Sequence, residues 1–198
     1  MIEEKIKSLD ITLPNPPTPA GSYIPAVKTG NLLFISGQIP MEDGKVLFTG
    51  KVSDDNLQTA QKSARMCAIN LLAQMKRELG NLDRVTRIVR LSGFVNSDPE
   101  FYQHPKVINA ASDLFFEIFG DKGKHSRIAM GVACLPLNSM TEIDAVIEFS
   151  EYKKLVSTII LLFYFFLQFS YEFFNFWFWN YSATCLIMST TRTTKTSC

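Results

Sequence analysis

Apolar residues recur at helical spacing in two segments of the chain. The longer segment begins near Asp54 and stops at Gly80, and the shorter covers about residues 105–119 and is followed by Gly120. Glycine is a common residue at the end of a helix. We therefore predict two amphipathic helices, with inward-facing residues Leu57, Ala60, Ala64, Cys67, Ala68, Leu71, Leu72 and Met75 in the first and Val107, Ile108, Ala111, Leu114, Phe115 and Ile118 in the second.

Short apolar runs of strand length lie before, between and after the two helical segments. Residues 24–27 and 32–36 flank the turn sequence Lys28-Thr29-Gly30-Asn31, which predicts a β-hairpin. Three further strands are predicted at residues 85–95, 128–135 and 141–149, and the last two are joined by a turn at residues 136–139.

The predicted elements follow the order ββ, α, β, α, ββ. This order indicates an α+β domain in which two helices cover one face of a mixed sheet. Within residues 128–135, small residues such as Ala129, Gly131 and Ala133 alternate with apolar ones, so both faces of the sheet can be buried. We expect subunit association to cover the face that has no helices.

Charge and the N-terminal composition limit the class of function. Lys and Arg number 20 and Asp and Glu number 19, which gives a formal net charge of +1 among 198 residues. Basic and acidic residues are interspersed, so we expect no nucleic-acid partner. Glu3, Glu4 and Asp10 precede any apolar run, which argues against a targeting peptide. These features predict a cytoplasmic protein.

The four cysteines predict neither a metal site nor a disulfide framework. Cys67, Cys134, Cys185 and Cys198 have no paired spacing and no histidine at ligand spacing. Cys67 and Cys134 are expected to be small core residues.

The composition changes sharply near residue 151. Residues 1–150 mix charged, small and branched residues, whereas residues 155–179 are almost entirely apolar and aromatic. The second segment is long enough to span a bilayer, but Glu172 and Asn175 inside it favour non-native translated sequence. We therefore predict a domain of residues 1–150 and a tail of residues 151–198, which is either a membrane anchor with the domain in the cytosol or an extension that the domain does not need.

The candidate chemistry lies at the start of the last two predicted strands. Arg127 opens one strand and Glu142 opens the next. An arginine can bind a carboxylate through two parallel hydrogen bonds, and a glutamate can transfer a proton. The pair suits chemistry on a small carboxylic acid, and an ordinary ion pair is the alternative. We expect the two residues to be in register on adjacent strands.

Several motifs, in this order, resemble the Rid family of reactive intermediate deaminases, formerly called YjgF proteins and also labelled L-PSP endoribonucleases. The resemblance covers about residues 23–149. It implies a chorismate-mutase-like fold that assembles as a homotrimer with clefts between subunits. The motifs are Ser36-Gly37-Gln38-Ile39-Pro40, Asn70-Leu71-Leu72, Val95-Asn96, Ser126-Arg127, Leu135-Pro136 and Glu142-Ile143.

The resemblance also implies an activity and its residues. Family members of the active type hydrolyse enamines or imines such as 2-aminoacrylate to 2-keto acids and ammonia, with no cofactor or metal. Carried over by motif, Arg127 would hold the substrate carboxylate and Glu142 would position or activate the attacking water. The residues that would line the substrate cleft are Tyr23, Ser36, Gly37 and Asn109.

Three features depart from the family's common pattern. Ile128 and His125 stand where smaller residues are usual, and residues 96–106 form a longer segment. Ile128 and the longer segment keep open the alternative of a non-catalytic trimer that binds small carboxylates or ketoacids as a regulator, or acts as a holdase. Ribonuclease activity ranks last, because neither His104 nor His125 has an evident partner or basic surroundings.

Overall fold

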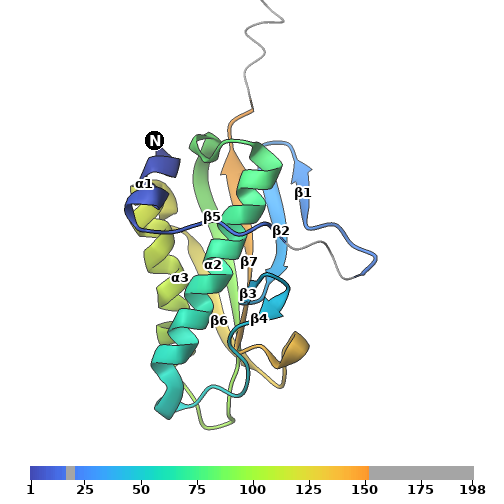
Figure 1. Ribbon diagram of the computed structural model, residues 1–198, viewed down its shortest axis with the longest axis vertical. Helices are drawn as coiled ribbons and strands as arrows, with labels where there is room; N and C mark the ends of the chain where they lie inside the picture. The colour runs from blue at the N-terminus through green and yellow to red at the C-terminus, as the bar shows by residue number, and fades with distance from the viewer. Residues whose placement is uncertain (17–20, 152–198) are drawn as a thin grey trace, which may run out of the picture. The chain divides into compact units, whose positions relative to one another are not determined.

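The computed structural model describes residues 1–16 and 21–151 of the chain. Its main sheet has five strands in the order β1-β2-β7-β5-β6 (Figure 1). Neighbouring strands are antiparallel except β5 and β6, which are parallel. The bounds are β1 (Ala26–Thr29), β2 (Leu32–Gln38), β5 (Val85–Asn96), β6 (Ser126–Val132) and β7 (Thr141–Phe149).

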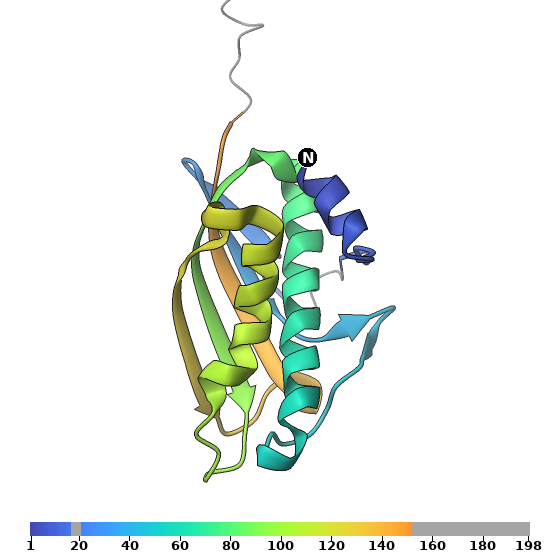
Figure 2. The same cartoon turned by 90° about the vertical axis from the view of Figure 1, so that its left-hand side faces the viewer.

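Two helices, α2 (Leu57–Leu79) and α3 (His104–Phe119), pack side by side on one face of the sheet (Figure 2). Each helix ends at a glycine with positive φ, 74° at Gly80 and 60° at Gly120. Glycine adopts this conformation without the steric penalty that a Cβ would bring. The predicted α+β fold, with two helices on one face of a mixed sheet, is confirmed.

The core lies between the helices and the sheet. Residues of β7 alternate between buried and half-buried, so Thr141 and Ile143 face the helices while Glu142 and Asp144 face the opposite side. The Thr141 hydroxyl lies 2.6 Å from the Ser63 hydroxyl of α2, which identifies the helix-covered face. The largest fully buried side chains are Phe115, Leu33, Leu71, Leu72, Met75, Leu82, Ile88, Leu91, Ile108, Leu114, Ile143 and Ile147.

The order of the strands corrects one expectation. Strand β5 lies between β6 and β7, because α3 carries the chain from β5 back to a parallel β6, and the loop after β6 then crosses to the other side of β5. Arg127 is opposite Leu91, whereas Glu142 is opposite Phe94. The expectation that Arg127 and Glu142 are in register on adjacent strands is wrong.

The end of β6 also differs from its prediction. The strand stops at Val132, and the loop that follows contains the 3-10 helix η4 (Pro136–Asn138). Cys134 therefore lies in the loop and is exposed, which corrects its assignment to the core. Cys67 is fully buried against the oxygens of Thr141, as predicted for a small core residue.

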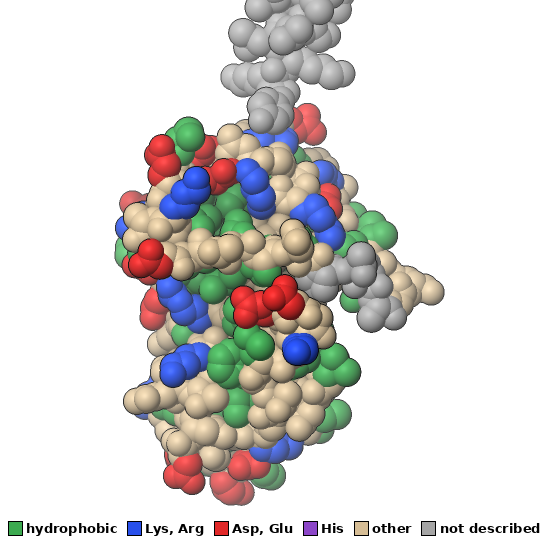
Figure 3. All heavy atoms as spheres, in the orientation of Figure 1, with side chains coloured by type: hydrophobic (Ala, Val, Ile, Leu, Met, Phe, Trp, Pro, Cys, Tyr) green, Lys and Arg blue, Asp and Glu red, His purple; other side chains and the backbone are tan. Residues whose placement is uncertain are grey.

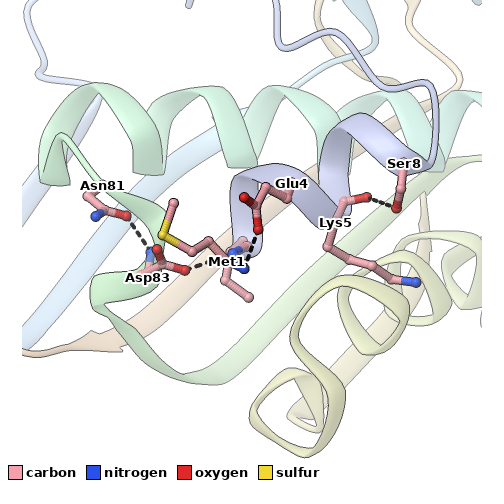
Figure 4. A network of polar contacts seen from close by, with 7 residues as sticks. Met1, Glu4, Lys5, Ser8, Asn81 and Asp83 are labelled. Atoms are coloured by element: carbon pink, nitrogen blue, oxygen red, sulfur yellow. Dashed lines mark hydrogen bonds and ion pairs between the residues drawn. The ribbon is translucent and has the colours of Figure 1, made fainter.

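An N-terminal helix, α1 (Ile2–Ser8), was not predicted. Ile6 is buried in the core, and the amide of Ile2 donates to Asp83 Oδ1 at 2.7 Å (Figure 4). The Met1 amino group also pairs with Glu4 at 2.9 Å. Seven residues rarely form a stable helix alone, so these tertiary contacts hold α1 in place.

The remaining elements are short. A two-stranded sheet pairs β3 (Met41–Glu42) with β4 (Lys45–Val46). Three 3-10 helices precede or follow the main elements, namely η1 (Asp54–Asn56), η2 (Leu82–Arg84) and η3 (Gly120–Gly123).

Charged side chains of both signs are interspersed on the face drawn in Figure 3, where no basic stripe is visible.

The described residues form one compact unit, Met1–Glu151. No helix within residues 1–16 and 21–151 is long and apolar enough to cross a membrane. The predicted tail lies outside the described residues apart from Glu151, so the tail and its membrane alternative stay predictions.

Candidate active site

Arg127 lies at the start of the edge strand β6, and its side chain is directed at α3. Its Nη1 donates to Asn109 Oδ1 at 2.8 Å and to Ser112 Oγ at 2.9 Å. Asn109 and Ser112 are three residues apart and so share one face of the helix. Because Nη1 carries two hydrogens, these two contacts engage the whole of that nitrogen.

The other edge of the same guanidinium is open. Within the described residues, no acceptor is bonded to Nε or Nη2 of Arg127. These two nitrogens donate in parallel and match the two oxygens of a carboxylate. The contacts with α3 therefore fix the plane of the guanidinium and leave the carboxylate-binding edge available.

Glu142 lies near the start of β7, on the face of the sheet that α2 and α3 do not cover. Its carboxylate packs against Gly37, where β2 has a bulge between Ile35 and Gln38. A Cβ added at Gly37 would collide with Glu142 Oε1, so this close approach requires glycine.

The carboxylate of Glu142 is held in an unfavourable setting for its charge. Burial raises its pKa, and the neighbouring Asp144 carboxylate raises the pKa further. The described residues donate no hydrogen bond to it, whereas such bonds would lower the pKa. A carboxyl whose pKa is raised exchanges a proton more readily near neutral pH, which suits a general acid or base.

Ser36 and Gly37 are held from two sides. The Ser36 hydroxyl donates to the carbonyl oxygen of Ile24 at 3.0 Å, which ties the bulge to the segment that follows Tyr23. Tyr23 itself is 53% exposed. A hollow of about 380 Å³ opens beside the bulge, with lining residues that include Phe34, Ser36, Gly37, Arg90, Ser92 and Asp144.

Gln38 and Gln74 support the bulge from the helix side. Gln38 Nε2 donates to the carbonyl oxygens of Ser36 and Gly37 at 2.9 and 3.2 Å, and Gln74 Nε2 of α2 donates to Gln38 Oε1 at 3.2 Å. Both glutamines are buried. Sequence reasoning missed these supporting roles, although Gln74 could have been flagged as a polar residue on the apolar face of a predicted helix.

The predicted site residues thus fall into two clusters. The Arg127 cluster contains Arg127 and Asn109, together with Ser112, which was not predicted. The Glu142 cluster contains Ser36, Gly37 and Glu142, and Tyr23 precedes Ile24, whose carbonyl oxygen accepts from Ser36. Within one chain, β5 separates the strands that carry Arg127 and Glu142, and the two side chains lie on opposite faces of the sheet. The ion-pair alternative is not formed within the described part of the chain.

The remaining sequence candidates lie outside the two clusters or at their margin. Ile128 pairs with Ser92 of β5. Each histidine has a serine partner, contrary to expectation: His104 Nε2 lies 2.9 Å from Ser97 Oγ, and His125 Nε2 lies 3.0 Å from Ser112 Oγ. Sequence reasoning missed Ser112, whose only local signal is its helical spacing from Asn109. No group of three or more metal-ligating side chains occurs in the described residues.

Comparisons with known proteins agree with this fold and with the sequence motifs. Residues 3–149 match the family described as "YjgF/chorismate_mutase-like, putative endoribonuclease". Protein TCP17 of Trypanosoma cruzi is 40% identical over 152 residues, which cover 76% of this chain and 95% of that protein. The crystal structure of Atu1372 from Agrobacterium tumefaciens, described as having unknown function, has a TM-score of 0.70 and 46% identity, and the match covers 75% of this chain and 92% of that one.

A further relative has a named activity. The 2-iminobutanoate/2-iminopropanoate deaminase of Dermatophagoides farinae is 26% identical over 138 residues, which cover 69% of this chain and 93% of that protein. The family match extends over most of the chain and includes both clusters. The chain therefore belongs to the YjgF/chorismate mutase-like family, as its motifs predicted.

Proposed function

We propose that the protein is a cytoplasmic enamine/imine deaminase that hydrolyses small 2-imino acids, such as the imine form of 2-aminoacrylate, to 2-keto acids and ammonia. The observation that carries the proposal is the Nε and Nη2 edge of Arg127, which bonds no acceptor within the described part of the chain and is held in place by Asn109 and Ser112. A fixed guanidinium edge suits the carboxylate that every 2-imino acid carries. The named activity of the relative from Dermatophagoides farinae supports the same substrate class.

The proposed chemistry needs orientation and proton transfer. The imine carbon is already electrophilic, so water adds to it while Glu142 accepts one water proton and passes it to the nitrogen, which gives a neutral carbinolamine. Glu142 then transfers the carbinolamine hydroxyl proton to the nitrogen as the C–N bond breaks and the C=O bond forms, which releases ammonia and leaves the 2-keto acid. The raised pKa of Glu142 suits both steps. General acid–base help of this kind contributes about 10²- to 10⁴-fold in rate.

The two clusters require a second copy of the chain. One subunit would supply Arg127 and Asn109, and the next would supply Glu142 with Tyr23, Ser36 and Gly37. Apolar side chains on the face without helices support such an association, since Val27 and Phe34 are 47% and 43% exposed. We propose a homotrimer, as the family resemblance implies, with a cleft at each of its three contacts.

A carboxylate-binding regulator is the second candidate function. The observation that favours it is that Arg127 and Glu142 lie on opposite faces of the same sheet, so the guanidinium edge is held without any contact with Glu142 in the described residues. Such a protein would bind 2-keto acids without accelerating any hydrolysis.

A coupled assay on the full chain tests the proposal. A serine or threonine dehydratase generates the imine, and the appearance of keto acid is followed with and without this protein. We expect faster release with the wild type and no acceleration with Arg127→Ala. Arg77→Ala, which removes an exposed arginine from α2, is the matched control and should keep the full rate. No acceleration by folded wild-type protein that binds 2-keto acids would favour the regulator.

A further inference from the structure

His125 is fixed on three sides between η3 and β6, two residues before Arg127. Its Nδ1 lies 2.6 Å from the carbonyl oxygen of Gly123, and its Nε2 lies 3.0 Å from the Ser112 hydroxyl. Phe115 packs edge-on against the ring, with centroids 6.4 Å apart and an interplanar angle of 83°. The position and the orientation of the ring are therefore defined by contacts on both α3 and the preceding turn.

These contacts determine where the protons lie. A carbonyl oxygen only accepts, so Nδ1 of His125 carries a proton and donates it to Gly123. In the neutral ring Nε2 is then an acceptor, and the Ser112 hydroxyl donates to it. Burial lowers the pKa of His125 and the Arg127 charge lowers it further, against the opposing effect of the Gly123 carbonyl, which favours this neutral form.

The orientation of the Ser112 hydroxyl hydrogen determines whether the Ser112 oxygen can accept a hydrogen bond from Arg127. A serine hydroxyl has one hydrogen, and in a helix it can also donate to the carbonyl of the preceding turn. With that hydrogen committed to His125, the oxygen lone pairs point away from the ring and accept from Arg127 Nη1 at 2.9 Å. A continuous chain of hydrogen bonds thus runs from Gly123 through His125 and Ser112 to Arg127.

We propose that His125 and Ser112 are positioning residues for Arg127. His125 orients the Ser112 hydroxyl, and Ser112, together with Asn109, holds Nη1 so that the Nε and Nη2 edge is presented to the carboxylate of a 2-keto or 2-imino acid. The identity of this ligand rests on the proposed function, whereas the order of the guanidinium does not.

The other serine–histidine pair offers a matched control. His104 Nε2 lies 2.9 Å from the Ser97 hydroxyl, and Phe101 packs edge-on against the ring, as Phe115 does at His125. His104 begins α3, whereas His125 lies beyond the other end of the helix, and the Ser97 hydroxyl has no arginine partner among the described residues. Replacement of His104 therefore removes a similar pair without touching the chain of bonds that leads to Arg127.

The first test observes the guanidinium directly by nitrogen-15 NMR on the full-length protein. Nη1 held by two acceptors should rotate slowly, so its protons give resolved signals, which are assigned by their loss in Arg127→Lys. In Ser112→Ala and His125→Leu we expect Nη1 to rotate faster, so that its proton signals are averaged and no longer resolved. His125→Gln, which keeps an acceptor, should retain part of the order, and His104→Leu should leave the signals unchanged. Unaltered Arg127 signals in folded His125→Leu and Ser112→Ala would overturn the proposal.

The second test measures binding of 2-oxobutanoate by calorimetry. Ser112→Ala and His125→Leu each remove a hydrogen bond from the series that links Gly123, His125, Ser112 and Arg127. Each variant should bind 2-oxobutanoate about tenfold more weakly. The double variant should also be weakened only about tenfold, because His125 acts through Ser112. A hundredfold loss in the double variant, or full affinity in both single variants, would contradict the positioning role.

The two tests separate this inference from the proposed function. Suppose that the Arg127 signals are resolved in the wild type and averaged in the variants, but that the wild type does not bind 2-oxobutanoate. This result supports the positioning role and overturns the proposed function. If the wild type and both single variants bind 2-oxobutanoate with equal affinity, only the positioning role is overturned. If His125→Leu fails to fold, His125→Gln and Ser112→Ala still decide the outcome.

Discussion

The Arg127 and Glu142 side chains occupy opposite faces of one sheet and are held in different ways. Arg127 gives both Nη1 hydrogens to neutral oxygens of α3, so its guanidinium is held in place while Nε and Nη2 bond no acceptor among the described residues. Glu142 receives no hydrogen bond from the described residues, and its pKa is raised by burial and by Asp144. The difference suits two roles. Rigid contacts help Arg127 to bind a carboxylate in one orientation, and a raised pKa helps Glu142 to accept and donate a proton.

Each helix supports one of the two clusters. Helix α3 contacts Arg127 directly through Asn109 and Ser112. Helix α2 acts through Gln74 and Gln38, which hold the carbonyl oxygens of the bulge that packs against Glu142. Both clusters are therefore anchored to the same helical layer, although Glu142 lies on the far side of the sheet.

Removal of the Glu142 charge should have the largest effect. Glu142→Gln cannot exchange a proton, and we expect imine hydrolysis in the dehydratase-coupled assay to fall about 10²- to 10⁴-fold. Binding of 2-oxobutanoate should change little, because Arg127 supplies the carboxylate contact. A variant that keeps the wild-type rate would remove Glu142 from the proposed mechanism.

The same Glu142→Gln variant should be more stable than the wild type at neutral pH. A raised pKa in the folded state means that the folded protein binds this proton more tightly than the unfolded chain does, so the stability from Glu142 is lost as pH rises through the folded pKa. The gain should be seen as a higher urea midpoint at pH 7. It should vanish below about pH 4, where the carboxyl is protonated in both states. An equal gain at both pH values would show that charge is not its cause.

Arg127→Lys tests the geometry of the first cluster without removing its charge. A lysine is a single donor centre and cannot bond Asn109, Ser112 and both carboxylate oxygens together. We expect kcat/KM to fall about 10²-fold, chiefly through KM. The matched change Arg77→Lys on α2 should have no effect. Wild-type kinetics in Arg127→Lys would show that charge alone is needed.

Gly37→Ala sharpens the comparison from the side of Glu142. The added Cβ would displace the carboxylate, and a small misplacement of a catalytic group should lower kcat about 10- to 100-fold. Gly131→Ala is the control, since its Cβ would instead press on Ser97 and His104, outside both clusters. Equal losses of kcat in the two variants would point to a general packing defect.

Mixing two inactive variants tests whether the clusters meet between subunits. Arg127→Ala and Glu142→Gln proteins, unfolded and refolded together in equal amounts, should regain activity at contacts that join one intact Arg127 to one intact Glu142. Random assembly of a ring with heterologous contacts makes about one contact in four complete, so we expect about one quarter of the wild-type rate. Each variant refolded alone is the control, and a mixture that stays inactive would contradict the shared site.

Most of the secondary structure could be predicted because its signals are local. Helical spacing of apolar residues defined α2 and α3, and Gly80 and Gly120 marked their ends. Helix α1 was missed because seven residues are too few for a periodic signal, and its stability depends on burial of Ile6 and the contact with Asp83. Cys134 was misassigned because its environment depends on where β6 stops.

By itself, the sequence determined the α+β class, the two long helices and the family, because periodicity, helix ends and motifs are written in neighbouring residues. Only the tertiary structure decided that β5 separates Arg127 from Glu142, that a bulge brings Gly37 against Glu142, and that His125 and Ser112 stand behind Arg127. Strand neighbours and sheet faces depend on long-range pairing, and a single strand inserted between two others changes which side chains meet.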